Sequence, residues 1–173
     1  MKIVSISSAA TAHQHMSVTD DFHEFYQLYS EPVYRTALRV TGNPVDAEDV
    51  LQNVFLRFLN RKTAIDPSRS PKAYMRRVAT NASIDLLRRK AAKPETDLEE
   101  GRDRSSPRSS PFLKEMLRSA LAKLPPQDAE LFVLCYLEGY TYEELAGQFG
   151  IERGTIASRL HRIKAVLKKE LSL

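Results

Sequence analysis

The chain has 173 residues, of which 42% are hydrophobic and 28% charged, and these proportions are typical of an ordinary folded globular protein. Its formal net charge of +4 permits a nucleic-acid partner without requiring one, and its single cysteine, Cys135, excludes an internal disulfide and a cysteine zinc site. No apolar run approaches the roughly 20 residues that cross a bilayer, so we expect a cytoplasmic protein without membrane insertion.

Residues 1–18 are expected to form a disordered tail, because one short apolar stretch there is followed by small and polar residues. Helical periodicity and capping residues then predict an all-α chain with eight helices and no strand. The predicted helices span 20–29, 32–41, 45–61 and 71–89 in the first half, and 112–123, 127–138, 142–148 and 154–171 in the second.

The helix predicted at 45–61 has two distinct faces. Its apolar stripe comprises Val50, Leu51, Val54, Phe55, Phe58 and Leu59. The opposite face carries Asp49, Gln52, Asn53 and Leu56. Acidic residues at its start and basic residues at its end suit the helix dipole, so a purely structural explanation of this face stays open beside a protein-binding one.

The helix predicted at 71–89 is strongly basic. Its inward residues are Tyr74, Met75, Val78, Ala82 and Leu86. Its outward edge carries Arg77, Asn81, Asp85 and Arg88, with Arg89 close by. Cations around a central amide can hold a phosphate backbone while the amide bonds a base edge, although a solvent-exposed helix with salt bridges has the same pattern.

The run 91–111 is expected to be a linker. It contains three prolines, four serines and nine charged residues, with a single large apolar side chain, Leu98, so it cannot bury enough surface to offset its ordering entropy. The chain therefore divides into two small helical domains at 19–90 and 112–173. Because the linker has too little apolar content to dock them, we expect the two domains to fold independently and to move relative to each other.

The segment that starts at Thr141 predicts a helix-turn-helix. Thr141 and Glu144 have the spacing of a capping box, and Gly150 supplies the sharp turn between the two helices. The apolar residues of the second helix, Ile156, Leu160, Ile163 and Leu167, form one narrow stripe.

The opposite side of that second helix is small and polar. It presents Gly154, Ala157, Ser158 and His161, flanked by Thr155, Arg162 and Lys164. Small and polar residues that fit a groove, beside cations that reach phosphate, indicate a helix that reads duplex DNA. A solvated face of an amphipathic helix is the structural alternative.

Four motifs in this order resemble the extracytoplasmic-function sigma factors of the sigma-70 family. They are Asp46-Ala-Glu-Asp-Val-Leu-Gln-Asn-Val-Phe-Leu-Arg, Asn81-Ala-Ser-Ile-Asp-Leu-Leu-Arg-Arg, Leu124-Pro-Pro-Gln-Asp and Gly154-Thr-Ile-Ala-Ser-Arg-Leu-His-Arg. The resemblance covers roughly residues 22–171. It implies a region 2-like helical bundle, a region 4-like helix-turn-helix domain, and a function in transcription initiation with core RNA polymerase and promoter DNA as partners.

The resemblance also implies roles for single residues. Core polymerase would bind Asp49, Gln52, Asn53 and Leu56. The minus-ten element would be melted and read by Arg77, Asn81, Arg88 and Arg89. The minus-thirty-five element would be read by Arg153, Gly154, Thr155, Ala157, Ser158, His161 and Arg162. An anti-sigma factor becomes a candidate partner, because many family members require one, and no cofactor is implied.

The chain departs from the family's usual pattern in three places. Position 157 is Ala where the family usually has a basic residue, so the contact with DNA there should be apolar or absent. Tyr74 stands where a Trp is frequent, and Arg102, Arg104 and Arg108 interrupt the acidic part of the linker. The promoter sequence is therefore expected to differ from those of relatives. The arginines also argue against a role for the second half of the linker as an acidic mimic of RNA.

Two other classes of function stay open on the sequence. A conventional regulator could use the same helix-turn-helix with a dimerising or sensing amino-terminal domain, and binding to core polymerase would separate the two. An enzyme is disfavoured, because His23 and His161 are isolated, and no His, Cys or carboxylate set has catalytic or metal-ligand spacing.

Overall fold

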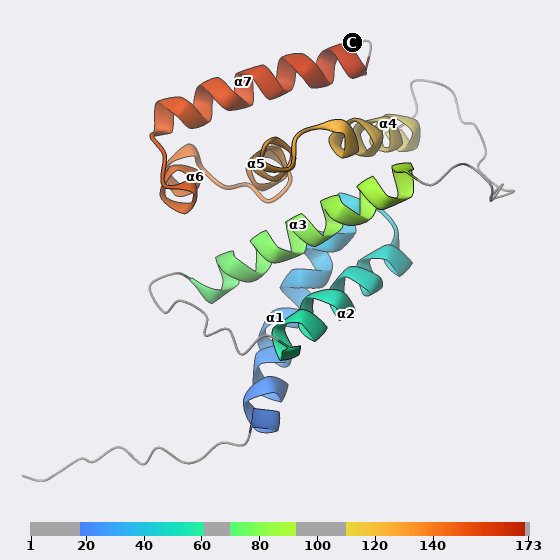
Figure 1. The fold of residues 1–173 in the computed structure, drawn as a ribbon, viewed down its shortest axis with the longest axis vertical. Helices are drawn as coiled ribbons and strands as arrows, with labels where there is room; N and C mark the ends of the chain where they lie inside the picture. The colour runs from blue at the N-terminus through green and yellow to red at the C-terminus, as the bar shows by residue number, and fades with distance from the viewer. Residues whose placement is uncertain (1–17, 61–69, 93–109, 172–173) are drawn as a thin grey trace, which may run out of the picture.

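The computed structural model describes residues 18–60, 70–92 and 110–171, and within these residues all regular structure is helical (Figure 1). The helices are α1 (Val18–Thr41), α2 (Pro44–Asn60), α3 (Pro71–Ala92), α4 (Ser110–Lys123), α5 (Pro126–Tyr136), α6 (Tyr142–Phe149) and α7 (Arg153–Glu170). This confirms the predicted all-α fold. Most of the predicted tail and linker lies outside the described residues.

Helix α1 runs without interruption across Pro32, where the sequence predicts a break between two helices. A proline inside a helix removes one backbone hydrogen bond and costs about 3 kcal/mol. Packing offsets this cost, because Val33 and Ala37, just beyond the proline, are fully buried where α1 lies against α2 and α3.

Helices α1, α2 and α3 enclose the first core. It comprises Val33, Ala37, Ala47, Val50, Val54, Phe55, Met75, Ala79 and Ala82. Aromatic rings from α1 and α2 extend this core, and Phe25 stacks on Phe58 with their ring centroids 4.1 Å apart. Two residues predicted to face inward do not: Leu59 is 48% exposed and Tyr74 is 38% exposed, because each lies at the edge of its helix's packed face.

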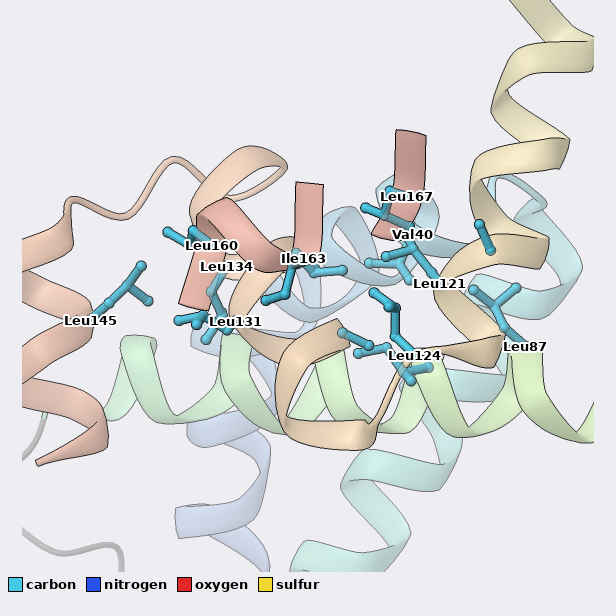
Figure 2. Close-up of a cluster of buried hydrophobic side chains, with 14 of the residues drawn as sticks. Val40, Leu87, Leu121, Leu124, Leu131, Leu134, Leu145, Leu160, Ile163 and Leu167 are labelled. Carbon is cyan, nitrogen blue, oxygen red and sulfur yellow. The ribbon is translucent and has the colours of Figure 1, made fainter. Parts of the chain in front are cut away.

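Helices α4 to α7 enclose a second core, which Figure 2 shows in close-up. Leu121 of α4, Leu131 and Leu134 of α5, and Leu160 of α7 are almost completely buried in it. The predicted stripe of α7 is confirmed, since its four apolar residues all belong to this core.

The second core also contains residues of the first bundle, which corrects the expectation that the two halves do not dock. Val40 of α1 and Leu87 of α3 are buried in the same cluster as the leucines of α4 and α5 (Figure 2). Ile84 of α3 also belongs to this cluster. In Figure 1, α3 accordingly lies between the α1–α2 pair and the layer formed by α4 to α7. The composition of the linker carried no information about the faces of α3, which is buried on two sides.

Gly42, which ends α1, lies at a crowded point of this contact. Its φ of +67° is a left-handed conformation that glycine adopts without strain. A Cβ atom at this position would also lie only 1.7 Å from the guanidinium of Arg118 on α4. These atoms are the far end of a flexible side chain that can move aside, so the left-handed turn, rather than this contact, constrains the residue.

Candidate nucleic-acid interface

The turn between α6 and α7 is fixed by local hydrogen bonds. The side chain of Thr141 accepts from the backbone N–H of Glu144 at 3.2 Å, and the Glu144 carboxylate accepts from the backbone N–H of Thr141 at 2.8 Å. Hydrogen bonds from the Thr141 backbone and then from its hydroxyl lower the pKa of Glu144. Gly150 adopts the left-handed conformation at φ +65° and ends α6. The predicted capping box and turn are both confirmed.

Helix α7 presents its small and polar side away from the core. Thr155, Ser158, His161 and Arg162 are exposed, with Arg153 and Gly154 at the amino-terminal end, and Ala157 is half-buried beside them. Ser158 donates its hydroxyl hydrogen to the carbonyl of Thr155 at 3.0 Å, so this hydroxyl is already oriented along the helix. The seven residues predicted to read duplex DNA thus share one accessible side.

Two cations of α7 have partners that the sequence did not suggest. Arg153 forms an ion pair with Glu143 of α6, in which both side chains remain about two-thirds exposed. The ammonium of Lys164 lies 5.1 Å from the ring centroid of Tyr136 in a cation–π contact. A hydrogen bond with Tyr136 raises the pKa of Lys164, so this side chain stays cationic beside the exposed face.

The outer face of α2 is open to solvent. Asp49, Gln52, Asn53 and Leu56 are all exposed, and Leu56 is 55% exposed. Asn53 donates its side-chain amide to the carbonyl of Asp49 at 2.8 Å, which holds it against its own helix. The structure therefore brings the four residues together as one small surface, with three polar residues followed by an exposed leucine.

Two contacts position the first turn of α2. The Asn43 side-chain oxygen accepts from the backbone N–H of Val45 at 2.8 Å. Asp46, which is buried, pairs with Lys90 near the end of α3, with its Oδ1 2.6 Å from Nζ. The register between α2 and α3 is thus fixed by charge as well as by apolar packing.

The basic edge of α3 faces the other half of the molecule and forms polar contacts with it, while Asn81 stays exposed and the Arg77 side chain is 30% exposed. Arg77 forms an ion pair with Glu130 of α5, and the Asn81 amide donates to the same carboxylate at 3.2 Å. The Arg77 guanidinium also lies over the ring of Phe149, 4.6 Å from its centroid. Of the four residues predicted to bind nucleic acid on this helix, these two share one carboxylate of this same chain.

Arg88 is held in a different way. Its Nε donates to the carbonyl of Ala122 at 3.3 Å, and its Nη2 donates to the carbonyl of Leu124 at 2.6 Å. These carbonyls lie at the carboxyl end of α4, where backbone acceptors lack helical partners and the dipole favours a cation. Arg89 remains exposed.

A second glutamate reinforces the contact. The Glu138 side chain, which is completely buried, accepts from Arg39 of α1 at 2.9 Å and lies 3.7 Å from Nε of Arg76 on α3. Sequence reasoning did not single out Glu130 or Glu138. A carboxylate inside the apolar run 129–137 was the available signal for Glu130, because a charge in such a run needs a partner.

A cavity of about 770 Å³ opens beside these contacts, between the first half of α3 and the segment from Glu138 to Gln148. Its lining includes Arg76, Arg77 and Asn81 from α3 and Glu138 and Glu144 from the other half. Its two walls belong to different halves of the chain, so it exists only while the halves are in contact.

The described residues contain no group of three or more His, Cys, Asp or Glu side chains that could hold a metal ion. Within the same residues, no helix has both the length and the apolar character of a membrane span.

Comparison with known proteins agrees with this geometry. The family "Sigma-70 region 2" matches residues 25–93, and "Sigma-70, region 4" matches residues 114–167. The chain is 30% identical over 158 residues to the RNA polymerase sigma-E factor of Streptomyces coelicolor, covering 87% of this chain and 86% of the relative. It is 28% identical over 167 residues to the ECF RNA polymerase sigma factor SigW of Bacillus subtilis, covering 88% and 89% respectively.

Two further relatives differ in how much of them is covered. The ECF RNA polymerase sigma factor SigE of Mycolicibacterium smegmatis is 32% identical over 158 residues, and the match covers 86% of this chain but 61% of that relative. The sigma factor RpoE of Bartonella quintana, solved in complex with the anti-sigma factor NepR, has a TM-score of 0.51 and 22% identity, and the match covers 88% of this chain and 98% of that one. The latter supports the fold.

Proposed function

The chain belongs to the extracytoplasmic-function sigma factors of the sigma-70 family, which initiate transcription and are not enzymes, and we propose that three separate surfaces carry this function. The proposed surfaces bind core RNA polymerase, the minus-ten promoter element and the minus-thirty-five element. The division into units at 19–90 and 112–173, with a linker at 91–111, is part of the same proposal.

The observation that carries the proposal for duplex DNA is the accessible side of α7. Arg153 and Arg162 can reach phosphate from the two ends of this side, and Ser158 and His161 can reach base edges between them. Ala157 and Gly154 leave room for the helix to approach the groove closely, and Thr155 offers an additional hydroxyl. We assign this side to the minus-thirty-five element.

The basic edge of α3 is assigned to the minus-ten element. Asn81 has donors and an acceptor for the edge of an unstacked base, and Arg77, Arg88 and Arg89 can follow the strand on either side. Extruding a base costs a few kcal/mol, so we expect this surface to act when polymerase binding contributes to the free energy of melting.

The exposed face of α2 is assigned to core polymerase. Leu56 gives this face an exposed apolar side chain, and Asp49, Gln52 and Asn53 lie beside it on the amino-terminal side, a mixture that suits a protein partner. The rigid anchoring of α2 by Asp46 and Lys90 supports the same assignment, because a preorganised surface loses less entropy on binding.

We further propose that the protein acts in the cytoplasm, where polymerase and promoter DNA are found. The Bartonella relative was solved with an anti-sigma factor, and a comparable inhibitor is a candidate partner of this chain. Such a protein would bind between or over the surfaces named above.

Run-off transcription with core polymerase and fragments of the source genome tests the proposal. Discrete transcripts that require the chain are expected, and their start sites would identify the promoter. An Arg162→Ala variant, which should retain core binding, serves as the control for promoter recognition. A chain that bound duplex fragments but never core polymerase would be a conventional regulator, and the proposal would fail.

A further inference from the structure

The cavity beside α3 has the size of a small-molecule site. Its volume of about 770 Å³ falls within the roughly 300–1,000 Å³ of pockets that hold small ligands. One wall is the first half of α3, and the other is the segment from Glu138 to Gln148. The described residues that line it include none of those assigned to core polymerase or to the minus-thirty-five element. A ligand in this cavity would therefore be an additional partner of the chain.

One end of the cavity carries positive charge. Lys72 and Arg76 both line it, and their spacing of four positions places them on the same side of α3. The Arg76 side chain is 30% exposed, and its Nε lies 3.7 Å from Oε2 of Glu138, which is too far for a hydrogen bond. Lys72 is exposed and has no charged partner among the residues that the structure describes. These two cations can therefore donate hydrogen bonds to a phosphate group.

The middle of the cavity offers aromatic surface and room for a planar ring. Tyr74 is 38% exposed on the α3 wall, and Tyr140 lines the opposite wall. Gly139 and Gly147 also line the cavity, and a Cβ atom at either position would meet nothing within 4 Å. The wall is open at these glycines, so a ring can enter and stack on a tyrosine.

The far end of the cavity offers a hydrogen-bond acceptor. Asn81 is exposed and donates one amide hydrogen to Glu130 at 3.2 Å. Its side-chain oxygen accepts no hydrogen bond from the described residues, so it can accept one from an amino group. At about 1.5 Å per residue, Asn81 lies roughly 10 Å along the helix from the midpoint between Lys72 and Arg76. A nucleotide places its phosphate and the outer edge of its base a comparable distance apart.

We propose that this cavity binds a nucleotide whose base carries an exocyclic amino group. The phosphate pairs with Lys72 and Arg76. The ring lies against Tyr74 and Tyr140, and its amino group donates to Asn81. Because Asn81 is also assigned to the minus-ten element, a bound nucleotide and the promoter strand compete for it. Binding of the nucleotide by the free chain does not depend on that assignment.

The first test titrates the free, full-length chain by calorimetry. Adenosine monophosphate and cytidine monophosphate are the probes, and three compounds each lack one feature of the second probe. Cytidine lacks the phosphate, uridine monophosphate has a carbonyl in place of the amino group, and inorganic phosphate lacks the ring. Each should bind at least roughly tenfold more weakly than cytidine monophosphate, as expected when one strong hydrogen bond is lost. Failure of both probes to bind, or equal affinity for the cytidine and uridine nucleotides, would overturn the proposal.

Two pairs of variants test whether the nucleotide lies in this cavity. Lys72→Gln removes the cation without a partner, and Lys114→Gln removes the same charge from the exposed side of α4, outside the cavity. The first should weaken binding of adenosine monophosphate roughly tenfold, and the second should leave it unchanged. Gly147→Leu fills the cavity, whereas Gly147→Ala makes a similar gain in helix propensity and adds one methyl group. The leucine variant should lose binding, and the alanine variant should keep it.

Circular dichroism checks that each variant is folded. Wild-type affinity for adenosine monophosphate in Lys72→Gln would overturn the assignment of the phosphate, and wild-type affinity in a folded Gly147→Leu would overturn the site. The titrations contain neither polymerase nor promoter DNA, so a negative result leaves the proposed function intact. Absence of polymerase-dependent transcripts would overturn the proposed function and leave the nucleotide site intact.

Discussion

Arg159 of α7 and Asp128 of α5 form an ion pair, with Nη2 2.7 Å from Oδ1, and the two side chains are only 21% and 29% exposed. This pair and the buried apolar stripe lie on the same side of α7, so together they set the rotation of the helix about its axis. The side assigned to the minus-thirty-five element is therefore oriented before DNA binds.

Arg162→Ala should weaken binding to all minus-thirty-five sequences about equally, because the arginine is assigned to phosphate. Loss of one phosphate contact should also lower the slope of log affinity against log salt by roughly one. Fluorescence anisotropy with matched and scrambled duplexes at several salt concentrations measures both. A loss confined to the matched duplex would move Arg162 to a base-reading role.

Ser158→Ala and His161→Ala should instead flatten the preference at one or two base pairs. Each good contact with a base edge is worth about 1 to 3 kcal/mol of discrimination. Competition among duplexes that differ at single positions reveals the affected base pair. If both variants lost affinity uniformly and kept their preference, the assignment of this side to base reading would be wrong.

Replacing Gln52 and Asn53 together with Lys should abolish binding to core polymerase and leave the melting temperature nearly unchanged, because both side chains are exposed. Glu24→Gln with Gln27→Lys makes the same change in net charge on the exposed side of α1 and serves as the control. Pull-down with core polymerase and thermal denaturation monitored by circular dichroism report the two effects. Retention of core binding by the first variant would remove α2 from the polymerase surface.

Asn81→Ala should leave binding to minus-thirty-five duplexes intact and reduce open-complex formation, because its proposed partner is an unstacked base. Permanganate footprinting of promoters bound by the variant and core polymerase measures the melted segment. The holoenzyme is the right form for this measurement, since in the free chain Asn81 also contacts Glu130. Normal opening on every template would exclude Asn81 from base recognition.

The capping box of α6 makes stability depend on pH in the acid range. The pKa of Glu144 is lowered from its ordinary value of 4.5 in the folded state, so its contribution is fully present above pH 4.5 and is lost as the pH falls through the lower folded-state value. Glu144→Gln keeps an acceptor oxygen but no titration, so the stability advantage of the wild type should shrink below pH 4.5. Urea unfolding at pH 7 and at pH 3 compares them.

Thr141→Ala tests how much the Thr141 hydroxyl contributes to the stability of the same capping box. The loss of an N-cap side chain should lower the free energy of unfolding by about 1 kcal/mol at pH 7. An unchanged value would mean that the backbone N–H of Thr141, which donates to Glu144, is sufficient to begin α6.

Local chemistry made α6 and α7 predictable from the sequence. The Thr141 cap, the left-handed Gly150 and the stripe from Ile156 to Leu167 depend on residues close in the chain, and the structure has them as expected. Pro32 was misleading, because the free-energy cost of a proline inside a helix is outweighed by the burial of α1 against helices distant in sequence.

The two-sided burial of α3 could not be predicted by the same reasoning. Periodicity identifies one apolar face, yet Met75 and Ala79 pack on the first core while Ile84 and Leu87 pack on the second. The partner of Arg77 depends on which elements of the second half pack against α3, and no spacing within 71–89 carries that information. The residue types of the candidate site were therefore predictable, but the groups of the chain that they contact were not.

The contact between the halves buries Ile84, Leu87, Leu121 and Leu124, and this burial affects how much apolar surface the chain exposes. Separation of the halves would expose apolar side chains on both sides of the break, and such surfaces favour self-association. While the halves are in contact, these side chains are covered, so the contact keeps apolar area out of water that separation would expose.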